Sequence, residues 1–123
     1  MEPPGGGRSV VAPSAGAVVL IPFPFSDLSQ ARLRPAVVLA DAGRGDWILC
    51  QITSKPYADP WAIMLDDASF AMGSLHLVSY ARPGNLFIAH HDLIVAEVDR
   101  LKADSFRTIV ETVVTILRSG LTP

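Results

Sequence analysis

Apolar positions along the chain follow two different periods, which divide the sequence into two parts. Up to about residue 89 they come in short, often β-branched runs with Pro and Gly between them, which is typical of β-strands. Pro22 and Pro24 are expected to end the first strand because proline has no amide hydrogen to give a neighbour. Likewise, residues 82–85, which include Pro83 and Gly84, are expected to end the fifth predicted strand. The predicted strands cover residues 17–21, 36–41, 47–53, 61–65 and 74–81, with a short extended piece at 85–89.

The C-terminal part has the period of a helix. Apolar residues from Phe106 to Leu117 recur at i, i+3, i+4, i+7, i+8 and i+11. Asp104 in the first turn and Arg118 in the last suit the helix dipole, and Gly120 is expected at the C-cap. Short strands followed by one amphipathic helix predict a mainly β fold with a C-terminal helix (α+β), namely a small, strongly bent antiparallel sheet or barrel with the helix packed on it.

Composition indicates one folded domain. Residues 1–14 are rich in Pro and Gly and are expected to form a disordered tail, whereas residues 15–123 form a single domain. Half of the 123 residues are hydrophobic and 18% are charged, below the roughly 25% that is usual for soluble domains. Apolar surface is therefore expected to remain after folding, which favours a homo-oligomer.

Several classes of protein and site are excluded. No apolar run approaches the ~18 residues that cross a bilayer, and the N-terminus lacks a signal-peptide pattern, so a cytoplasmic protein without membrane contact is expected. The only cysteine, Cys50, lies in a strand-like run and is expected to be a small buried hydrophobe. A net charge of −2 is unlike a generally basic nucleic-acid binder, so any phosphate recognition must be local.

A local candidate follows the first strand. The aromatic and Pro-rich stretch IPFPFSDLS leads into a polar loop with Arg32 and Arg34, and then into the apolar run 36–40. A guanidinium at the mouth of a buried strand indicates an anion-binding site. A surface ion pair is the alternative interpretation of Arg34.

Four segments in order make the candidate more specific. IPFPFSDLS, LRPAVVLA, DWILCQITS and SYARPGNLF resemble the MazF/PemK toxin family of toxin–antitoxin systems, over residues 16–118. The resemblance implies an SH3-like small barrel of the CcdB/PemK/MazF type, usually a homodimer. It also implies metal-independent, sequence-specific cleavage of single-stranded RNA without a cofactor. A cognate antitoxin would inhibit the protein, and DNA would be bound only indirectly, through the complex with that antitoxin. One departure is Gly16-Ala17, where the family usually has Gly-Asp.

The resemblance assigns two catalytic residues, Arg34 and Thr53. Arg34 would bind the phosphoryl oxygens and Thr53 would donate its hydroxyl to the same group, with Ser54 as the nearest rival. A strand-end hydroxyl that caps a turn is the alternative for Thr53, and a turn arginine that binds local carbonyls is the alternative for Arg82. Either Phe23 or Phe25 would stack on bases, and alternation indicates that the other belongs to the core. The expected substrate-binding residues are Phe25, Ser26, Asp27, Arg32, Ser54, Lys55 and Arg82.

RNA is cut without metal when its own 2′-hydroxyl attacks the adjacent phosphorus, a step in which two protons move. Arginine is a poor base because it is effectively always protonated. His76, His90 and His91 have no spacing that connects them to Arg34 and Thr53 or that predicts a metal site, so they are interpreted as surface or structural residues. The base stays unassigned. Two other functions remain open, a non-enzymatic CcdB-like toxin that acts by protein contact and an inactive paralogue.

Overall fold

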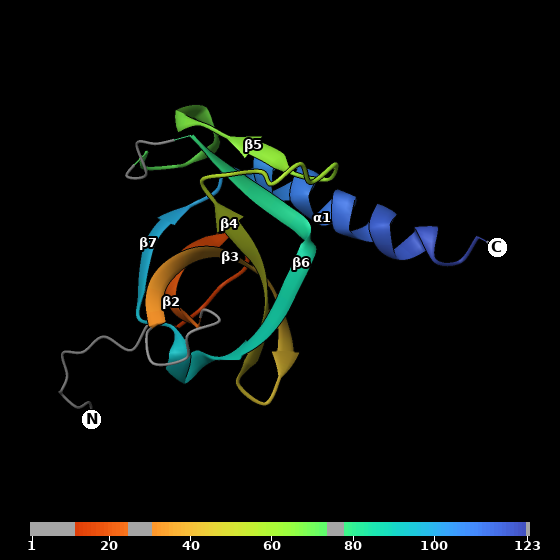
Figure 1. The fold of residues 1–123 in the computed structure, drawn as a ribbon. Helices are drawn as coiled ribbons and strands as arrows, with labels where there is room; N and C mark the ends of the chain where they lie inside the picture. The colour runs from red at the N-terminus through yellow and green to blue at the C-terminus, as the bar shows by residue number, and fades with distance from the viewer. Residues whose placement is uncertain (1–11, 25–30, 74–77, 123) are drawn as a thin grey trace, which may run out of the picture.

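The computed structural model describes residues 12–24, 31–73 and 78–122. Within them, six antiparallel strands form one curled sheet in the order β5-β6-β4-β3-β2-β7, an open half-barrel with a C-terminal helix (Figure 1). This architecture confirms the predicted fold class. The elements are β2 (Ala17–Pro24), β3 (Ala31–Gly43), β4 (Asp46–Thr53), β5 (Ile63–Leu65), η1 (Asp67–Ser69), β6 (Ser79–His90), η2 (His91–Leu93), β7 (Ala96–Arg100) and α1 (Ala103–Ser119).

The middle of the sheet is buried on both faces. Val37 and Leu39 of β3 belong to a cluster that includes Ile109 of α1. Ala36 and Val38, which alternate with them, belong to a second cluster on the other face of the strand. Burial on both faces explains why this part of β3 is a continuous apolar run in the sequence.

Strand β2 continues through both prolines, so the prediction that they end it was wrong. Pro22 pairs with Leu33 and Pro24 pairs with Ala31 of β3. The carbonyl of Leu20 accepts from the Val95 amide on the opposite edge of β2. Pro22 and Pro24, two and four positions further on, direct their backbone nitrogens toward the same edge, beyond the last residue of β2 that pairs with β7. A missing amide hydrogen therefore costs no ladder bond there.

Strand β6 also runs further than predicted. Residues 82–85 do not close it, because Ile52 pairs with Ala81 while Cys50 pairs with Leu86. The four residues between Ala81 and Leu86 thus form a bulge opposite Gln51, after which the ladder resumes. Strand β7 was not predicted at all, and the predicted strand 61–65 is shorter, at Ile63–Leu65. Residues 74–77 of the predicted fifth strand, like residues 1–11 of the predicted tail, lie outside the described residues.

Helix α1 confirms the predicted helix, but only the first part of its apolar face is covered by the sheet. Ile109 is fully buried, and Phe106, Val110 and Val113 pack around it. Val114 and Leu117, further along the same face, are exposed, because the end of the helix extends beyond the sheet (Figure 1). Gly120 is the C-cap but has a right-handed conformation. No helix in the described parts of the chain is both long enough and apolar enough to cross a membrane.

Candidate nucleic-acid interface

The two predicted catalytic residues lie on adjacent antiparallel strands. Ala36 of β3 pairs with Gln51 of β4. Arg34 precedes Ala36 by two residues and Thr53 follows Gln51 by two, so continuation of this register sets Arg34 opposite Thr53. Residues opposite each other in an antiparallel pair project from the same face. Residues 19 positions apart in the sequence are thus brought to the same end of the β3–β4 pair.

The side chain of Thr53 is nearly enclosed. Thr53 is 6% exposed, and its Oγ1 accepts a hydrogen bond from the Lys55 amide at 3.3 Å. This bond is the turn-capping interaction that the sequence left open as the alternative for this residue. It uses a lone pair of the hydroxyl oxygen and not the hydroxyl proton, so capping and donation to a ligand are compatible.

Arg82 is engaged inside the protein. Its Nε donates to Asp59 Oδ2 at 2.9 Å and its Nη1 donates to Gln51 Oε1 at 3.3 Å. The guanidinium also lies over the ring of Tyr57, 5.5 Å from the centroid. Arg82 therefore joins β6 to β4 and to the loop that follows β4. This network is close to the turn-arginine interpretation, although its acceptors are side-chain oxygens and not backbone carbonyls.

The loop 54–60 is built around this arginine. The guanidinium of Arg82 and the backbone N–H of Trp61 both donate to the Asp59 carboxylate, and they lower its pKa below the ordinary value. Tyr57 and Ala58 are consecutive non-glycine residues with positive φ angles of 55° and 57°. Such residues are uncommon and strained, so the Arg82 contacts help to hold a loop that its own backbone preferences disfavour.

The other predicted RNA contacts divide into two groups. Arg32 in β3, and Ser54 and Lys55 after β4, are exposed, whereas Arg34 is half-buried. Phe25, Ser26 and Asp27 lie outside the described residues. Phe23 packs in the core edge-on against Phe87, with 5.2 Å between the ring centroids, which confirms that one of the two phenylalanines is a core residue.

Sequence reasoning missed three polar side chains at this end of β4. Gln51 accepts hydrogen bonds from Arg82 and from Asn85, and Asp59 pairs with Arg82. Gln51 carried a signal, because it is the polar residue inside the apolar run 47–52. Asp59 and Asn85 carried none, since Asp59 precedes Pro60, Asn85 follows Gly84, and such positions are typical of a solvated loop.

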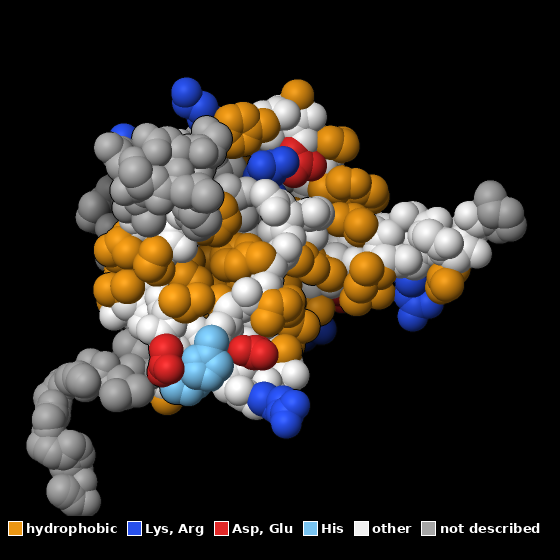
Figure 2. Space-filling model, turned by 60° about the horizontal axis from the view of Figure 1, so that its bottom comes forward, with side chains coloured by type: hydrophobic (Ala, Val, Ile, Leu, Met, Phe, Trp, Pro, Cys, Tyr) orange, Lys and Arg blue, Asp and Glu red, His pale blue; other side chains and the backbone are white. Residues whose placement is uncertain are grey.

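The described histidines lie away from Thr53. His90 pairs with Asp46 at the start of β4, whereas Thr53, at its end, pairs with Tyr80. His90 and His91 are on the surface with acidic side chains beside them (Figure 2). Neither is therefore placed to act as the general base beside Thr53. His76 lies outside the described residues. Cys50 is buried as predicted, and burial raises the pKa of its thiol to about 12.

Comparison with known proteins gives a match at the level of structure. No protein-family model and no curated protein sequence matches the chain. A MazE-MazF complex from Deinococcus radiodurans matches with a TM-score of 0.67 and 20% identity, over 85% of this chain and 95% of that one. An endoribonuclease in complex with its cognate antitoxin, from a mycobacterial species, matches with a TM-score of 0.64 and 17% identity, over 86% and 95%.

A third structure extends the comparison to a further toxin. The Mycobacterium tuberculosis toxin MazF-mt6 matches with a TM-score of 0.63 and 11% identity, over 83% of this chain and 96% of that one. The matches cover nearly the whole length of each neighbour, so the half-barrel and the C-terminal helix are shared as one unit. This chain therefore has the fold of the MazF toxins, as the four sequence segments predicted.

Proposed function

We propose that this protein is an endoribonuclease toxin that cleaves single-stranded RNA at specific sequences without a metal ion. The observation that supports the proposal is the β3–β4 register, whose continuation beyond the Ala36–Gln51 pair would set Arg34 opposite Thr53. Its support also includes the fold, which it shares with an endoribonuclease bound to an antitoxin. The exposed cations Arg32 and Lys55 on the same two strands and the loop after them would attract phosphate.

The chemistry is a transesterification within the RNA. The 2′-hydroxyl loses its proton and forms a bond to the adjacent phosphorus, and the bond from phosphorus to the 5′-oxygen breaks. The products are a 2′,3′-cyclic phosphate and a 5′-hydroxyl that has gained a proton. Arg34 presents two parallel N–H donors to the phosphoryl oxygens, and Thr53 donates its hydroxyl to the same charge as it grows. Phe25, Ser26, Asp27, Ser54 and Arg82 complete the proposed RNA contacts.

The proposal includes the protein's partners and setting. Residues 15–123 would form one domain that acts in the cytoplasm as a homodimer. A cognate antitoxin would inhibit it by laying an acidic segment near Arg34 and Arg82, and DNA would be bound only through that complex. A solution mass measurement on the pure protein tests the dimer. Co-purification with the product of the neighbouring open reading frame tests the antitoxin, and recovery of the protein alone would count against it.

The activity is tested by incubating the protein with a long mixed-sequence RNA in EDTA and mapping the new ends. We expect cuts at a short recurring sequence, with 5′-hydroxyl and cyclic phosphate ends. Arg34→Ala should slow cleavage by at least about 100-fold, the usual cost of one preorganised donor to a transition-state charge. Thr53→Val should slow it too, whereas Thr53→Ser, which keeps the hydroxyl, should retain most activity.

Two variants serve as controls. Arg107→Ala removes an exposed cation from α1 and should cleave like the unmodified protein. Ser54→Ala, which removes one proposed binding contact, should lose less activity than Thr53→Val, and a larger loss would transfer the role of Thr53 to the neighbouring hydroxyl. Full cleavage by a folded Arg34→Ala variant would refute the proposed site. Toxicity in cells without any RNA cleavage would instead indicate a CcdB-like toxin, and neither toxicity nor cleavage an inactive paralogue.

A further inference from the structure

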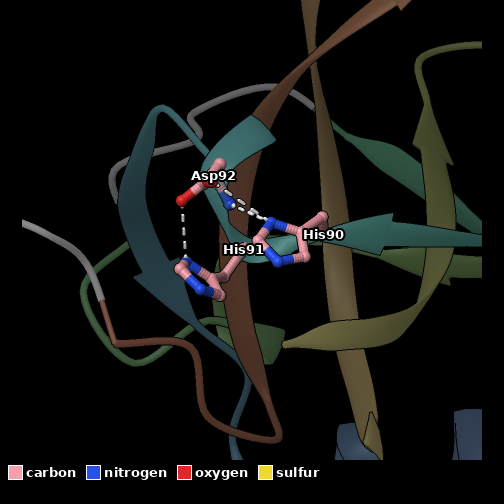
Figure 3. Close-up of side chains that lie close together, drawn as sticks. All are labelled: His90, His91 and Asp92. Atoms are coloured by element: carbon pink, nitrogen blue, oxygen red, sulfur yellow. Dashed lines mark hydrogen bonds and ion pairs between the residues drawn. The ribbon is translucent and has the colours of Figure 1, made fainter. Parts of the chain in front are cut away.

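Three side chains of metal-binding types meet where β6 leads into β7. His90, His91 and Asp92 are consecutive residues at the start of η2 (Figure 3). One ligand atom from each lies within 4.8 Å of the other two. The sequence did not indicate this cluster, because His90 and His91 were expected in a loop, for which a pattern gives no side-chain directions. The turn into η2 brings both imidazoles to the same side as the carboxylate (Figure 3).

Each imidazole lies at about a ligand-to-ligand distance from a different oxygen of Asp92. His90 Nδ1 lies 3.4 Å from Asp92 Oδ2, and His91 Nδ1 lies 3.2 Å from Asp92 Oδ1. Ligands of a tetrahedral zinc ion, bound at about 2.0–2.1 Å, are roughly 3.3–3.5 Å apart. The Asp92 amide donates to His90 Nδ1 at 3.2 Å. An ion would replace this hydrogen bond.

The backbone around the cluster holds it in place. His90 pairs with Asp46, and the His91 amide donates to the Gly45 carbonyl at 2.8 Å. Gly45 has a φ of 82°, and a Cβ there would lie 2.7 Å from His90 Nε2 and 3.0 Å from His91 Cδ2. The two imidazole rings thus pack against the β3–β4 turn, with their centroids 4.3 Å apart. Little ordering would be needed on binding.

The cluster is open to solvent and its surroundings favour a cation only moderately. The side chains of His90, His91 and Asp92 are 42%, 37% and 75% exposed. His91 also lines an open hollow of about 430 Å³, together with Asp41 and Arg44. Asp41 adds negative charge near the cluster, and Arg44 opposes it. Two imidazoles and one carboxylate are a ligand set that zinc accepts, with water in the remaining position.

We infer that His90, His91 and Asp92 form a Zn²⁺ site on the surface at the β6–β7 connection. The site lies at the opposite end of β4 from Thr53, roughly 20 Å away along the strand at about 3.3 Å per residue. An ion here would not reach an RNA phosphate held by Arg34. The inference is therefore independent of the proposed function, and either can fail without the other.

The site is tested by titrating ZnCl₂ into the full chain, without a histidine tag, in a calorimeter. We expect one ion per chain. His91→Ala and Asp92→Asn should each weaken binding by at least about tenfold, since even loss of an outer partner of a metal ligand typically costs 10–100-fold. Gly45→Ala should weaken it as well, because the added methyl group would displace both imidazoles. His76→Ala, which removes the third histidine of the chain, is the matched control and should bind like the unmodified protein.

A second measurement locates the ion. In NMR spectra of the imidazole groups, Zn²⁺ should shift the resonances of two histidines and leave those of His76 in place. Absence of saturable binding to the unmodified protein would overturn the inference. Equal binding by folded His91→Ala and Asp92→Asn variants would also overturn it, as would a loss caused by His76→Ala. Circular dichroism confirms the fold of each variant, and the exposed His91 and Asp92 are the positions least expected to disturb it.

Discussion

At the scale of single residues, Arg82 has two competing partners. Inside the protein it donates to Asp59, and in the proposed complex it would contact RNA phosphate. The side chains of Arg82 and Asp59 are 25% and 10% exposed, so the pair is only partly screened by water. The negative charge of Asp59 therefore opposes the approach of RNA to the one cation that the sequence singled out on β6.

Asp59→Asn tests this competition. The amide keeps an oxygen that can accept from Arg82 and removes the charge, so we expect tighter RNA binding, by about fivefold, equivalent to roughly 1 kcal/mol for one unit charge near the surface. Fluorescence anisotropy with a single-stranded DNA analogue, which has no 2′-hydroxyl to react, measures it. Glu111→Gln on α1 is the control. An equal effect of both variants would show that only total charge matters.

Cys50 gives a second prediction, for alkaline pH. Burial raises the pKa of its thiol from 9.0 to about 12, so the unfolded chain loses this proton at a lower pH than the folded protein. The contribution of Cys50 is fully present below about pH 9 and should decline above it by about 1.4 kcal/mol per pH unit. Cys50→Ala should lose less stability between pH 9 and 11. Urea unfolding at each pH measures the difference, and parallel curves for both proteins would contradict it.

At the scale of elements, β7 depends on a buried carboxylate. Asp99 is fully buried, and its Oδ1 accepts from the Met72 amide at 3.0 Å and from the Arg100 amide at 2.7 Å. These bonds join the strand to the segment after η1. Asp99 also pairs with Val18 of β2, so one side chain fixes the junction of three segments.

Asp99→Ala should therefore be costly. Removal of the carboxylate leaves the Met72 amide without this acceptor, and an unsatisfied buried donor costs about 1–3 kcal/mol of stability. Chemical denaturation measures the change. Asp67→Ala, at an exposed carboxylate in η1, is the control and should lie within about 0.5 kcal/mol of the unmodified protein. Equal stability of both variants would mean that water replaces the Asp99 oxygen.

Elements with a clear period could be predicted and those whose burial depends on distant partners could not. The run 36–40 and the apolar spacing from Phe106 to Leu117 specify their elements locally. The sequence of β7, AEVDR, looks like a polar loop because its burial comes from pairing with β2 and from the Asp99 hydrogen bonds. The prolines of β2 were wrongly predicted to end the strand. Which edge of β2 lacks a partner beside them depends on β7, a strand more than 70 residues away in the sequence.

The candidate site was predictable to a similar degree. Arg34 and Thr53 were proposed from the resemblance of the motifs, and their roles stay a prediction, although continuation of the β3–β4 register would set them opposite each other. The partners of Arg82 could not be named, since Asp59 and Gln51 reach it from a loop and from another strand. Contacts of this kind depend on side-chain directions that a sequence pattern does not contain.

At the scale of the whole molecule, charge limits how RNA is attracted. The chain has 12 acidic and 10 basic residues, so its overall field does not draw in a polyanion. In the proposed complex, attraction would come from the few cations near the end of β4, namely Arg32, Arg34, Lys55 and Arg82.

The salt dependence of RNA binding should reflect this small number. Four phosphate contacts predict a slope of about −3 for log K against log salt concentration, since each contributes about −0.7 on a single strand. Lys55→Ala should reduce the slope by about 0.7, whereas Arg107→Ala on α1 should leave it unchanged. Anisotropy titrations at four or five salt concentrations measure it. A much steeper slope would mean that a larger basic surface binds the RNA.

The pairing of β2 with β7 has a consequence for synthesis of the chain. Ala17 pairs with Arg100, so the first described strand receives its second neighbour only when residues near 100 have left the ribosome. Until then, the apolar stretch from Val18 to Leu20 presents an unpaired edge, which is the kind of segment that aggregates. Pro22 and Pro24 protect the next part of the same edge, because neither can donate to a foreign strand. Closure through such distant residues also slows folding, toward the millisecond-to-second range of about 10⁻³–1 s.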